Sequence, residues 1–578
     1  MGRIIWADVV SGEKAQFIAD VFNECLFDYS FDSNKVPSLN LHFFCKDYIT
    51  TYLLVKEGIM QDGNMIPLNE ELEYIISSSP WLPEGVSKDL FYFKNNQGKL
   101  FDVSTDKNVS QEKKTDYYYS IAKQIDDRFS SSNSYCKSIV NQIKKLIDSP
   151  SFTTSEKKVL YFCVREYICE LINLGLNKQH LFNRVQINLF TNKRVDNDKK
   201  YIIDFLLSVI PKNEKYIVVF GISDDVYKEL KGIIKIIRKS SQYENDKLSS
   251  NYVAESTTMA IDPVSALFQV KESFSAIISI YNATLHSSEI SLLDNGLVKK
   301  ESSKTYTLIN DKRNLLKKLP TKRKEERDKV LKTVASGGLN ANLLSAFELH
   351  NNAIRLSDAQ SQLLSLWTIF ELLIETKQNF MNRINYVSNA VISVLNSNYY
   401  RRIFENLYLQ IKITKGINAI IKAESRGDSV PEKLLYIIKD NNSMLAQIKK
   451  KLERFPLERY KLDFYSDLLV DAKLIYQDLI RHSNRLRWQI MRIYRNRCMI
   501  VHDGSSMPYL EFITENLHYY IDEVLECIIS YMNLGNKKND TAFNSARAKE
   551  AHSIRILETV VSEKRSITDV ELHKALFT

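Results

Sequence analysis

The sequence lacks the glycine-rich phosphate loops of nucleotide-hydrolysing and dinucleotide-binding proteins. Neither G-x-x-x-x-G-K-[ST] nor G-x-G-x-x-G occurs anywhere in it. Because those loops supply the backbone N–H groups that hold phosphates, we expect neither ATP hydrolysis nor a cofactor. Glycine and proline are also scarce, at 16 and 11 of 578 residues, which favours a mainly helical protein.

Cysteine is sparse and scattered. The seven cysteines form no C-x-x-C pair and have no histidine at zinc-ligand spacing, so we predict reduced thiols, no disulfide framework and no metal site. Cys498 precedes His502 by about one helical turn. That spacing leaves two interpretations: a Cys–His pair, or a small apolar side chain on the core side of a helix.

Long apolar runs are absent as well. No run approaches the roughly 20 residues that a membrane-spanning helix needs. The first residues, MGRIIWADVVSGEK, lack the apolar core and cleavage site of a signal peptide, so we expect a cytoplasmic protein without membrane contact. At 578 residues the chain should form several domains, because single cores stop growing near ~250–300 residues.

The first 300 residues predict a mostly helical α+β region. Residues 1–150 indicate no activity, although short strands are expected at 91–93 and 100–103. Residues 151–300 are predicted to be an α+β unit for sensing or docking, with a capped helix from Thr154, a strand at 215–223, a loop at 240–261, a helix from Pro263 to Thr284 and strand-like alternation up to 300.

The excess positive charge is concentrated in one stretch. Thirteen lysines and arginines against five acids lie between Lys299 and Lys332, an excess of eight in a chain of net charge +9. Such a stretch attracts a phosphate backbone, or it is a solvated linker helix. We predict a basic linker at 301–338 whose candidate RNA contacts are Lys317, Lys318, Lys322, Arg323 and Lys324.

The segment RIYRNRCMIVHDG, Arg492 to Gly504, is the strongest candidate for a catalytic site, because almost nothing else in the chain offers a comparable set of reactive residues. Arg495 and His502 are seven residues apart, close to two helical turns, so both side chains should leave one helix on the same face. Arginine stays charged and an imidazole titrates near neutral pH. Such a pair suits phosphate chemistry, with Asn496 and Arg497 beside it.

This segment resembles the R-x(4–6)-H signature of the HEPN superfamily, in which the residue after the arginine is often Asn, His or Asp. A second stretch, Leu344 to Glu375, resembles the paired early helices of that fold, and its Trp367–Glu371 run resembles the family's W-x-A-L-E segment. The resemblance spans Leu339 to Asn536. It implies a HEPN-like helical bundle at 339–535, followed by a helical tail at 536–578. The predicted fold class is therefore mainly α.

Several HEPN proteins are endoribonucleases that need no metal, and the residues fit that chemistry. His502 would move protons and Arg495 would stabilise charge on the phosphorane while the ribose 2′-OH attacks. Asn496 would position an oxygen, and Glu371 would either orient Arg495 or act as an ordinary structural carboxylate. The products would be a 2′,3′-cyclic phosphate and a 5′-OH end, and DNA would be inert.

The resemblance further implies a homodimer through the Arg495–His502 helix, because one histidine supplies half of ordinary acid–base catalysis. It also implies an anti-phage or toxin effector that cleaves cellular RNA, with tRNA a candidate substrate and a phage-derived trigger or regulatory partner protein. The alternative is a non-catalytic RNA- or nucleotide-binding module that acts as the partner of another enzyme.

Overall fold

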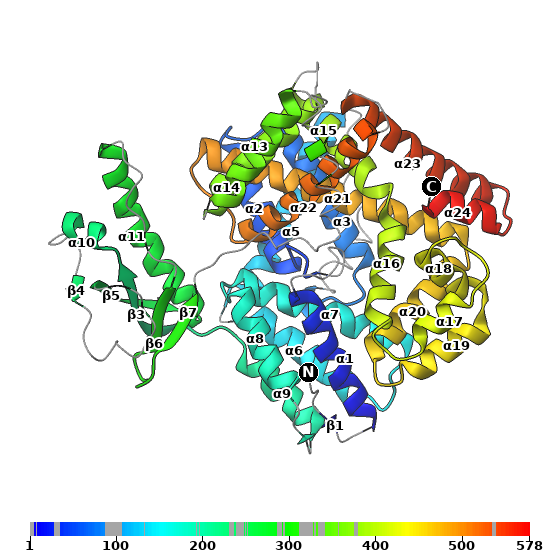
Figure 1. Cartoon of the computed structure of the whole chain (residues 1–578), viewed down its shortest axis with the longest axis horizontal. Helices are drawn as coiled ribbons and strands as arrows, with labels where there is room; N and C mark the ends of the chain where they lie inside the picture. Colours follow the sequence, from blue (N-terminus) through cyan, green and yellow to red (C-terminus); the bar gives the residue numbers. More distant parts are fainter. Residues whose placement is uncertain are drawn as a thin grey trace.

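The structure is a computed structural model. It describes residues 5–6, 9–27, 35–86, 107–131, 133–191, 194–195, 197–230, 236–238, 248, 250, 252–285, 292, 295–310, 328, 331–332, 341–356, 358–374, 380–533 and 539–577. The prediction of a mainly α protein with some α+β character is confirmed (Figure 1). The strands expected at 91–93 and 100–103 lie outside the described residues.

The first part of the chain is a helical bundle. Its helices are α1 (Val9–Leu26), α2 (Leu41–Lys56), α3 (Met65–Ser78), α5 (Lys107–Phe129), α6 (Ser134–Asp148), α7 (Thr154–Asn173), α8 (Lys178–Leu189) and α9 (Asp198–Ser208), with a 3-10 turn η2 (Asp62–Asn64). Two short strands, β1 (Ile5–Trp6) and β2 (Arg194–Val195), pair in parallel. The cap predicted within the Thr154–Glu156 segment begins one residue earlier, at Thr153, as a reciprocal box in which Thr153 and Glu156 each bond the other's backbone N–H.

A small sheet follows the bundle. Among the described residues it is antiparallel and five-stranded, in the order β4-β5-β3-β6-β7. Its elements are β3 (Glu214–Ile222), α10 (Asp224–Leu230), β4 (Ile236–Arg238), β5 (Tyr252–Ala260), α11 (Pro263–Leu285), β6 (Asn295–Lys300) and β7 (Thr307–Asn310). The strand predicted at 215–223 is therefore the central strand, and the helix α11 packs along one face of the sheet (Figure 1).

The loop predicted over 240–261 is wrong for its second half. Residues 252–260 form β5, which pairs along its whole length with β3. The segment YVAESTTMA is rich in polar residues, and for that reason it was predicted to be a loop. A strand whose one face is partly exposed needs apolar residues only on its buried face. Val253 and Ala254, near the start of β5, are buried, whereas Thr257 and Met259, near its end, are exposed.

The remainder is helical. Its helices are α13 (Ala341–Arg355), α14 (Ala359–Leu373), α15 (Phe380–Asn396), α16 (Tyr399–Ile411), α17 (Ile417–Lys422), α18 (Val430–Asp440), α19 (Asn442–Lys451), α20 (Pro456–Leu469), α21 (Ala472–His502), α22 (Leu510–Asn533), α23 (Asn539–Ser562) and α24 (Asp569–Phe577). The apolar spacing of residues 462–480 predicts a separate helix that leads through residues 481–484 into the motif helix. In the structure the break falls earlier, at Asp471, which caps α21. From there one 31-residue helix runs to His502.

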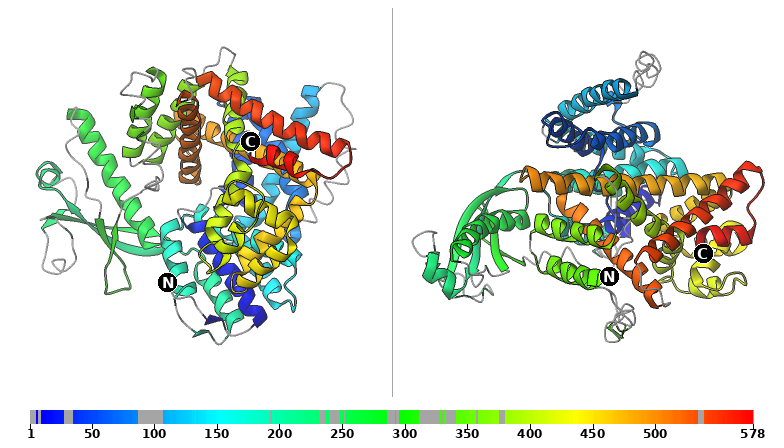
Figure 2. Two further views of the ribbon diagram at one scale, coloured as in Figure 1. Left: turned by 45° about the vertical axis from the view of Figure 1, so that its right-hand side comes forward. Right: turned by 90° about the horizontal axis from the view of Figure 1, so that it is seen from above.

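One buried core joins the first helices to the later ones. The largest apolar cluster contains Phe17 and Tyr48 from the first bundle together with Trp367, Ile490 and Tyr509 from the C-terminal half. The domain boundary expected at residue 150 therefore falls inside a continuous core. A second cluster fills α16–α20 and α24, and the sheet has small clusters of its own. In all views the sheet and α11 project from one side of the helical body (Figures 1 and 2).

Candidate active site at the end of helix α21

Helix α21 carries the predicted motif in its last turns. The Asp471 carboxylate accepts the Lys473 N–H at 2.8 Å and begins the helix. Gly504, with a φ of +67°, adopts the left-handed backbone that commonly follows a helix end. At about 1.5 Å per residue the helix is roughly 46 Å long. His502 is its last residue and is exposed to solvent.

Arg495 does not reach the surface. Its side chain is 1% exposed, and its Nη2 donates to Asp47 Oδ2 at 2.8 Å. Asp47 lies on α2 and is itself 2% exposed. Burial alone would raise the pKa of Asp47, but the positive charges of Arg495 and Arg492, together with the Tyr509 hydroxyl, hold that pKa below its usual value.

Arg492 lies one turn earlier and enters the same polar cluster. Its Nε lies 3.4 Å from Asp47 Oδ2, its Nη2 donates to Glu71 Oε2 at 2.5 Å, and its Nη1 donates to Gln489 Oε1 at 2.9 Å. Glu71 belongs to α3. Both carboxylates that face these two arginines therefore come from the first helical bundle, more than 400 residues away in sequence.

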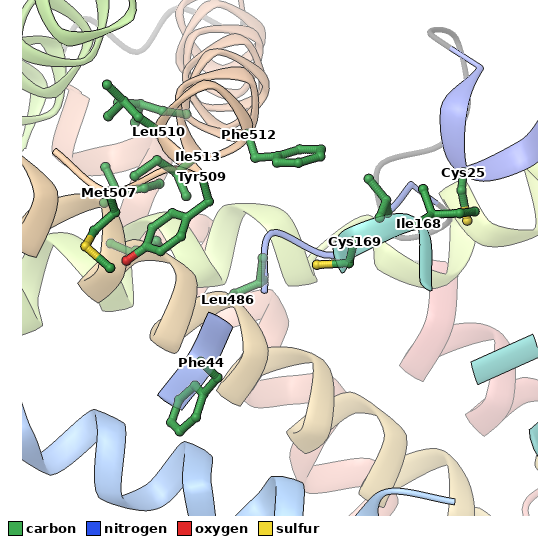
Figure 3. Close-up of a cluster of buried hydrophobic side chains, with 14 of the residues drawn as sticks. Cys25, Phe44, Ile168, Cys169, Leu486, Met507, Tyr509, Leu510, Phe512 and Ile513 are labelled. Carbon is green, nitrogen blue, oxygen red and sulfur yellow. The ribbon is translucent and has the colours of Figure 1, made fainter. Parts of the chain in front are cut away.

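Asn496 is also enclosed, with no exposed surface. Its Nδ2 donates to the Arg492 carbonyl at 3.1 Å and lies 3.4 Å from the Tyr509 hydroxyl, while its Oδ1 accepts the Met507 N–H at 3.3 Å. Figure 3 shows Met507 and Tyr509 in the buried cluster at the start of α22, with the Tyr509 hydroxyl directed away from Leu510. This amide ties α21 to the chain that returns after His502.

Arg497 and His502 are the motif residues that solvent reaches. His502 is exposed and Arg497 is half-buried. Four residues separate them, so this pair satisfies an R-x(4–6)-H spacing, as Arg495 and His502 do with six. The structure therefore brings Arg495 and His502 onto one helix but not into one solvent-facing site.

Cys498, between Arg497 and His502, is an interior side chain. It is 8% exposed, and burial raises the pKa of its thiol against the opposing effects of Tyr494 and Arg497. A thiol with a raised pKa holds little of the nucleophilic thiolate at neutral pH. Of the two interpretations of Cys498, the geometry favours the small apolar core residue.

Glu371 has a different neighbour from the one considered in the sequence. Its Oε1 accepts the Trp367 indole N–H at 3.2 Å, one turn earlier on α14. In the described part of the chain, the acid paired with Arg495 is Asp47 rather than Glu371. The basic candidates Lys317, Lys318, Lys322, Arg323 and Lys324 lie outside the described residues.

The sequence did not predict the residues that hold the two arginines, namely Asp47, Glu71 and Tyr509. A usable signal was present: Arg492 and Arg495 are three residues apart on a helix segment whose other residues are largely apolar, and a buried guanidinium requires an acid. The sequence does not say which acid, because the partners lie on α2 and α3.

Comparison of the chain with protein-family models, with curated proteins and with solved structures finds no match. Within the described residues, no group of three His, Cys, Asp or Glu side chains is arranged to hold a metal ion. No helix among them has both the length and the apolar character to cross a membrane.

Proposed function

We propose that this protein is an endoribonuclease of the HEPN type that cleaves RNA by attack of the ribose 2′-OH and needs no metal. The observation that supports the proposal best is the exposed imidazole of His502 at the end of a helix whose preceding turns are held by buried ion pairs. An exposed imidazole on an anchored helix is suited to proton transfer, because its position is fixed while its ring nitrogens meet substrate.

The burial of Arg495 shifts the arginine role to Arg497. A guanidinium that stabilises the phosphorane must touch the non-bridging oxygens, and Arg495 is enclosed with Asp47. Arg497 is half-buried, and four residues lie between it and His502 in the motif. In this proposal Arg497 contacts the phosphate, His502 moves the proton, and Arg495 and Asn496 maintain the helix that carries them.

One histidine handles one proton at a time, whereas cleavage needs both a base and an acid. A second copy of the chain would supply the second imidazole. Val501, beside His502, is 49% exposed, and Leu356, just before the start of α14, is 36% exposed. Gln360 near the start of α14 donates to Ser506 after His502 at 3.1 Å, so both apolar residues belong to this end of the molecule. They support an isologous homodimer across α21.

A role in anti-phage defence, or as a toxin that cuts cellular RNA such as tRNA in response to a phage-derived trigger, rests on the HEPN resemblance. The second candidate is a non-catalytic RNA- or nucleotide-binding module. One observation favours it: Arg495 and Asn496, half of the motif's polar residues, serve internal contacts instead of facing solvent.

The experiment is RNA cleavage in EDTA, on total RNA and on tRNA, with the product ends mapped. We expect 2′,3′-cyclic phosphate and 5′-OH ends from the wild type, and at least about a 10²-fold slower reaction from His502→Ala or Arg497→Ala. Matched controls are His552→Ala, an exposed histidine on α23, and Arg487→Ala, an exposed arginine on α21. Neither control should lose activity.

Two outcomes would replace this proposal. Equal cleavage by the wild type and both motif variants would place the activity outside these residues, for example in a contaminating nuclease. RNA binding without cleavage by the purified wild type and in cells that express it would establish the binding-module alternative. The proposed homodimer has its own test, which is the mass of the wild type and of Val501→Asp measured by light scattering. We expect a dimeric wild type and a monomeric variant.

A further inference from the structure

A single carboxylate holds both sides of the turn that carries His502. Asp47 Oδ2 accepts Arg495 Nη2 at 2.8 Å, and Asp47 Oδ1 accepts the Tyr509 hydroxyl at 2.6 Å. Arg495 precedes His502 along the chain and Tyr509 follows it. The carboxylate therefore joins the last turns of α21 to the residues just before α22, because one of its oxygens binds Arg495 and the other binds Tyr509.

The same turn is closed a second time from within. The Met507 N–H donates to Asn496 Oδ1 at 3.3 Å, inside the loop that Asp47 closes. Between these ties lie Asp503 and Gly504, which are exposed, and His502 itself. Only the few residues between these contacts are therefore free to move, and the residues on either side of them are held to α2 by Asp47.

The helix that supplies Asp47 is well fixed. The Asn40 side chain caps its first turn by accepting the Phe43 N–H at 3.0 Å. One residue after Asp47, Tyr48 donates to Asn69 Oδ1 of α3 at 2.6 Å and is fully buried. A carboxylate on such a helix has little freedom to follow a moving partner, so it can impose its own position on Arg495 and Tyr509.

We propose that Asp47 is the positioning residue of the candidate active site: from α2, in the first helical bundle, it fixes the turn on which His502 is presented. The catalytic part of this inference rests on the proposed function, and the positional part does not. It assigns the first bundle, whose residues 1–150 indicate no activity by sequence, a direct part in the geometry of the site. Asp47 is buried and touches no substrate, so it acts through Arg495 and Tyr509.

The charge of Asp47 is required for this role as well as its shape. Two guanidinium groups, from Arg492 and Arg495, face it where all three side chains are at most 3% exposed. A neutral amide in its place leaves those charges without full compensation, and such charges favour conformations that bring them to water. Arg492 retains Glu71, so the loss falls mainly on Arg495 and on the turn beyond it.

The test is hydrogen–deuterium exchange of the full-length chain, with RNA cleavage in EDTA measured on the same samples. In Asp47→Asn we expect the amides of residues 496–509 to exchange about tenfold faster, with the exchange of α6 and α7 unchanged. The turnover number should fall about tenfold with little change in KM, because the fault lies in presenting His502 and not in binding. Asp47→Glu, which keeps the charge, should restore part of both.

Two further variants keep the test decisive if Asp47→Asn folds poorly. Tyr509→Phe removes the bond to Asp47 and the longer contact with Asn496 Nδ2 but leaves the ion pair, so faster exchange should be largest at residues 503–509 and smaller than in Asp47→Asn at residues 496–502. Glu24→Gln is the matched control: Glu24 is a buried carboxylate of α1 that pairs with Lys461 of α20 and accepts the Gln410 amide N–H of α16 at 2.9 Å, so these partners lie on neither α2 nor α21. Its exchange at 496–509 should equal that of the wild type.

The positional inference is overturned if residues 496–509 exchange at the wild-type rate in Asp47→Asn and in Tyr509→Phe, or if Glu24→Gln loosens them equally. If residues 496–509 exchange faster in Asp47→Asn but RNA cleavage is unchanged, Asp47 fixes the turn without contributing to catalysis. A wild type that does not cleave RNA would reject the proposed function, while the exchange data would still judge the position of the turn.

Discussion

Trp367 Nε1 donates a hydrogen bond to Glu371 Oε1 across 3.2 Å, one turn apart on α14. The Trp367 ring lies 5.5 Å from the ring of Tyr494 on α21, measured between centroids. The aromatic contact joins α14 to the motif helix, and Glu371 orients the indole that makes it. Both residues of the W-x-A-L-E-like run therefore act at the α14–α21 contact.

If this is the role of Glu371, removing the acceptor should matter and removing the charge should not. Glu371→Ala leaves the indole N–H of the buried Trp367 without its acceptor and should lower the free energy of unfolding by about 1–3 kcal/mol. Glu371→Gln keeps an oxygen in place and should stay within about 0.5 kcal/mol of the wild type. Urea denaturation of both variants measures the difference. A Glu371→Gln protein of unchanged stability that loses RNA cleavage would instead give the carboxylate a role in catalysis.

The two arginines of the motif should respond differently to truncation. Arg495→Ala leaves the Asp47 carboxylate buried with one of its cations missing, a change that typically costs about 3–5 kcal/mol of stability. Arg497 is half-buried, so Arg497→Ala should cost less than about 1 kcal/mol. Thermal and urea unfolding of both proteins would show the contrast. Equal losses would mean that the ion pair with Asp47 contributes little.

The helices with local signals could be predicted from the sequence. Thr153 and Glu156 stand at the spacing of a capping box, and α7 begins there. The strand β3 was found because it is continuously apolar, as a central strand needs to be. The strand β5 was missed because the sheet buries only part of it, and Asp471 was passed over as a helix start because the apolar pattern continues on both sides.

The sequence predicted the helix that carries the site but not the residues from other helices that pack against it. Helical periodicity placed Arg495 and His502 on one face, and α21 does carry both. Burial depends on what packs against that face, however, and Asp47 comes from a helix more than 400 residues earlier. Seven-residue spacing does not distinguish an arginine that faces solvent from one that faces α2.

Glu166 predicts a loss of stability as pH rises. Burial raises the pKa of this carboxyl to about 7 from an ordinary value of 4.5, against the opposing hydrogen bonds from Tyr135 and from the Leu41 backbone. The folded protein therefore holds a proton that the unfolded chain releases above pH 4.5, so stability should fall between pH 4.5 and 7 and then level off. The full effect is on the order of 3 kcal/mol.

The measurement is urea denaturation at several pH values between 4.5 and 8, with the wild type compared with Glu166→Gln. Glutamine accepts from Tyr135 and Leu41 but does not titrate, so the contribution that falls with rising pH should disappear from the variant. Identical pH profiles for the two proteins would show that Glu166 is ionised in the folded state throughout this range.

His518 predicts the opposite dependence at lower pH. It is 1% exposed on α22, its Nε2 lies 3.4 Å from Gln362 Oε1, and its ring centroid lies 5.7 Å from that of His350 on α13. Burial, and then the charge of His350, lower the pKa of His518 to about 3. Asp522 and Glu515 also lie on α22, and Asp522 faces His350.

Because the unfolded chain binds a proton at this histidine below about pH 6.5 and the folded protein does not, acid should destabilise the fold. Between pH 6.5 and 5 the contribution of His518 is about 2 kcal/mol. Glu166 contributes a slope of the opposite sign over that interval, so in His518→Phe the slope of unfolding free energy against pH should be less positive than the wild-type slope, or become negative. The variant also starts less stable because Gln362 loses its partner. Replacing the exposed His552 by glutamine provides the control, and its slope should match the wild type. A wild-type slope retained in His518→Phe would assign the acid sensitivity to other groups, and would mean that the imidazole between α13 and α22 accepts its proton without disturbing their packing.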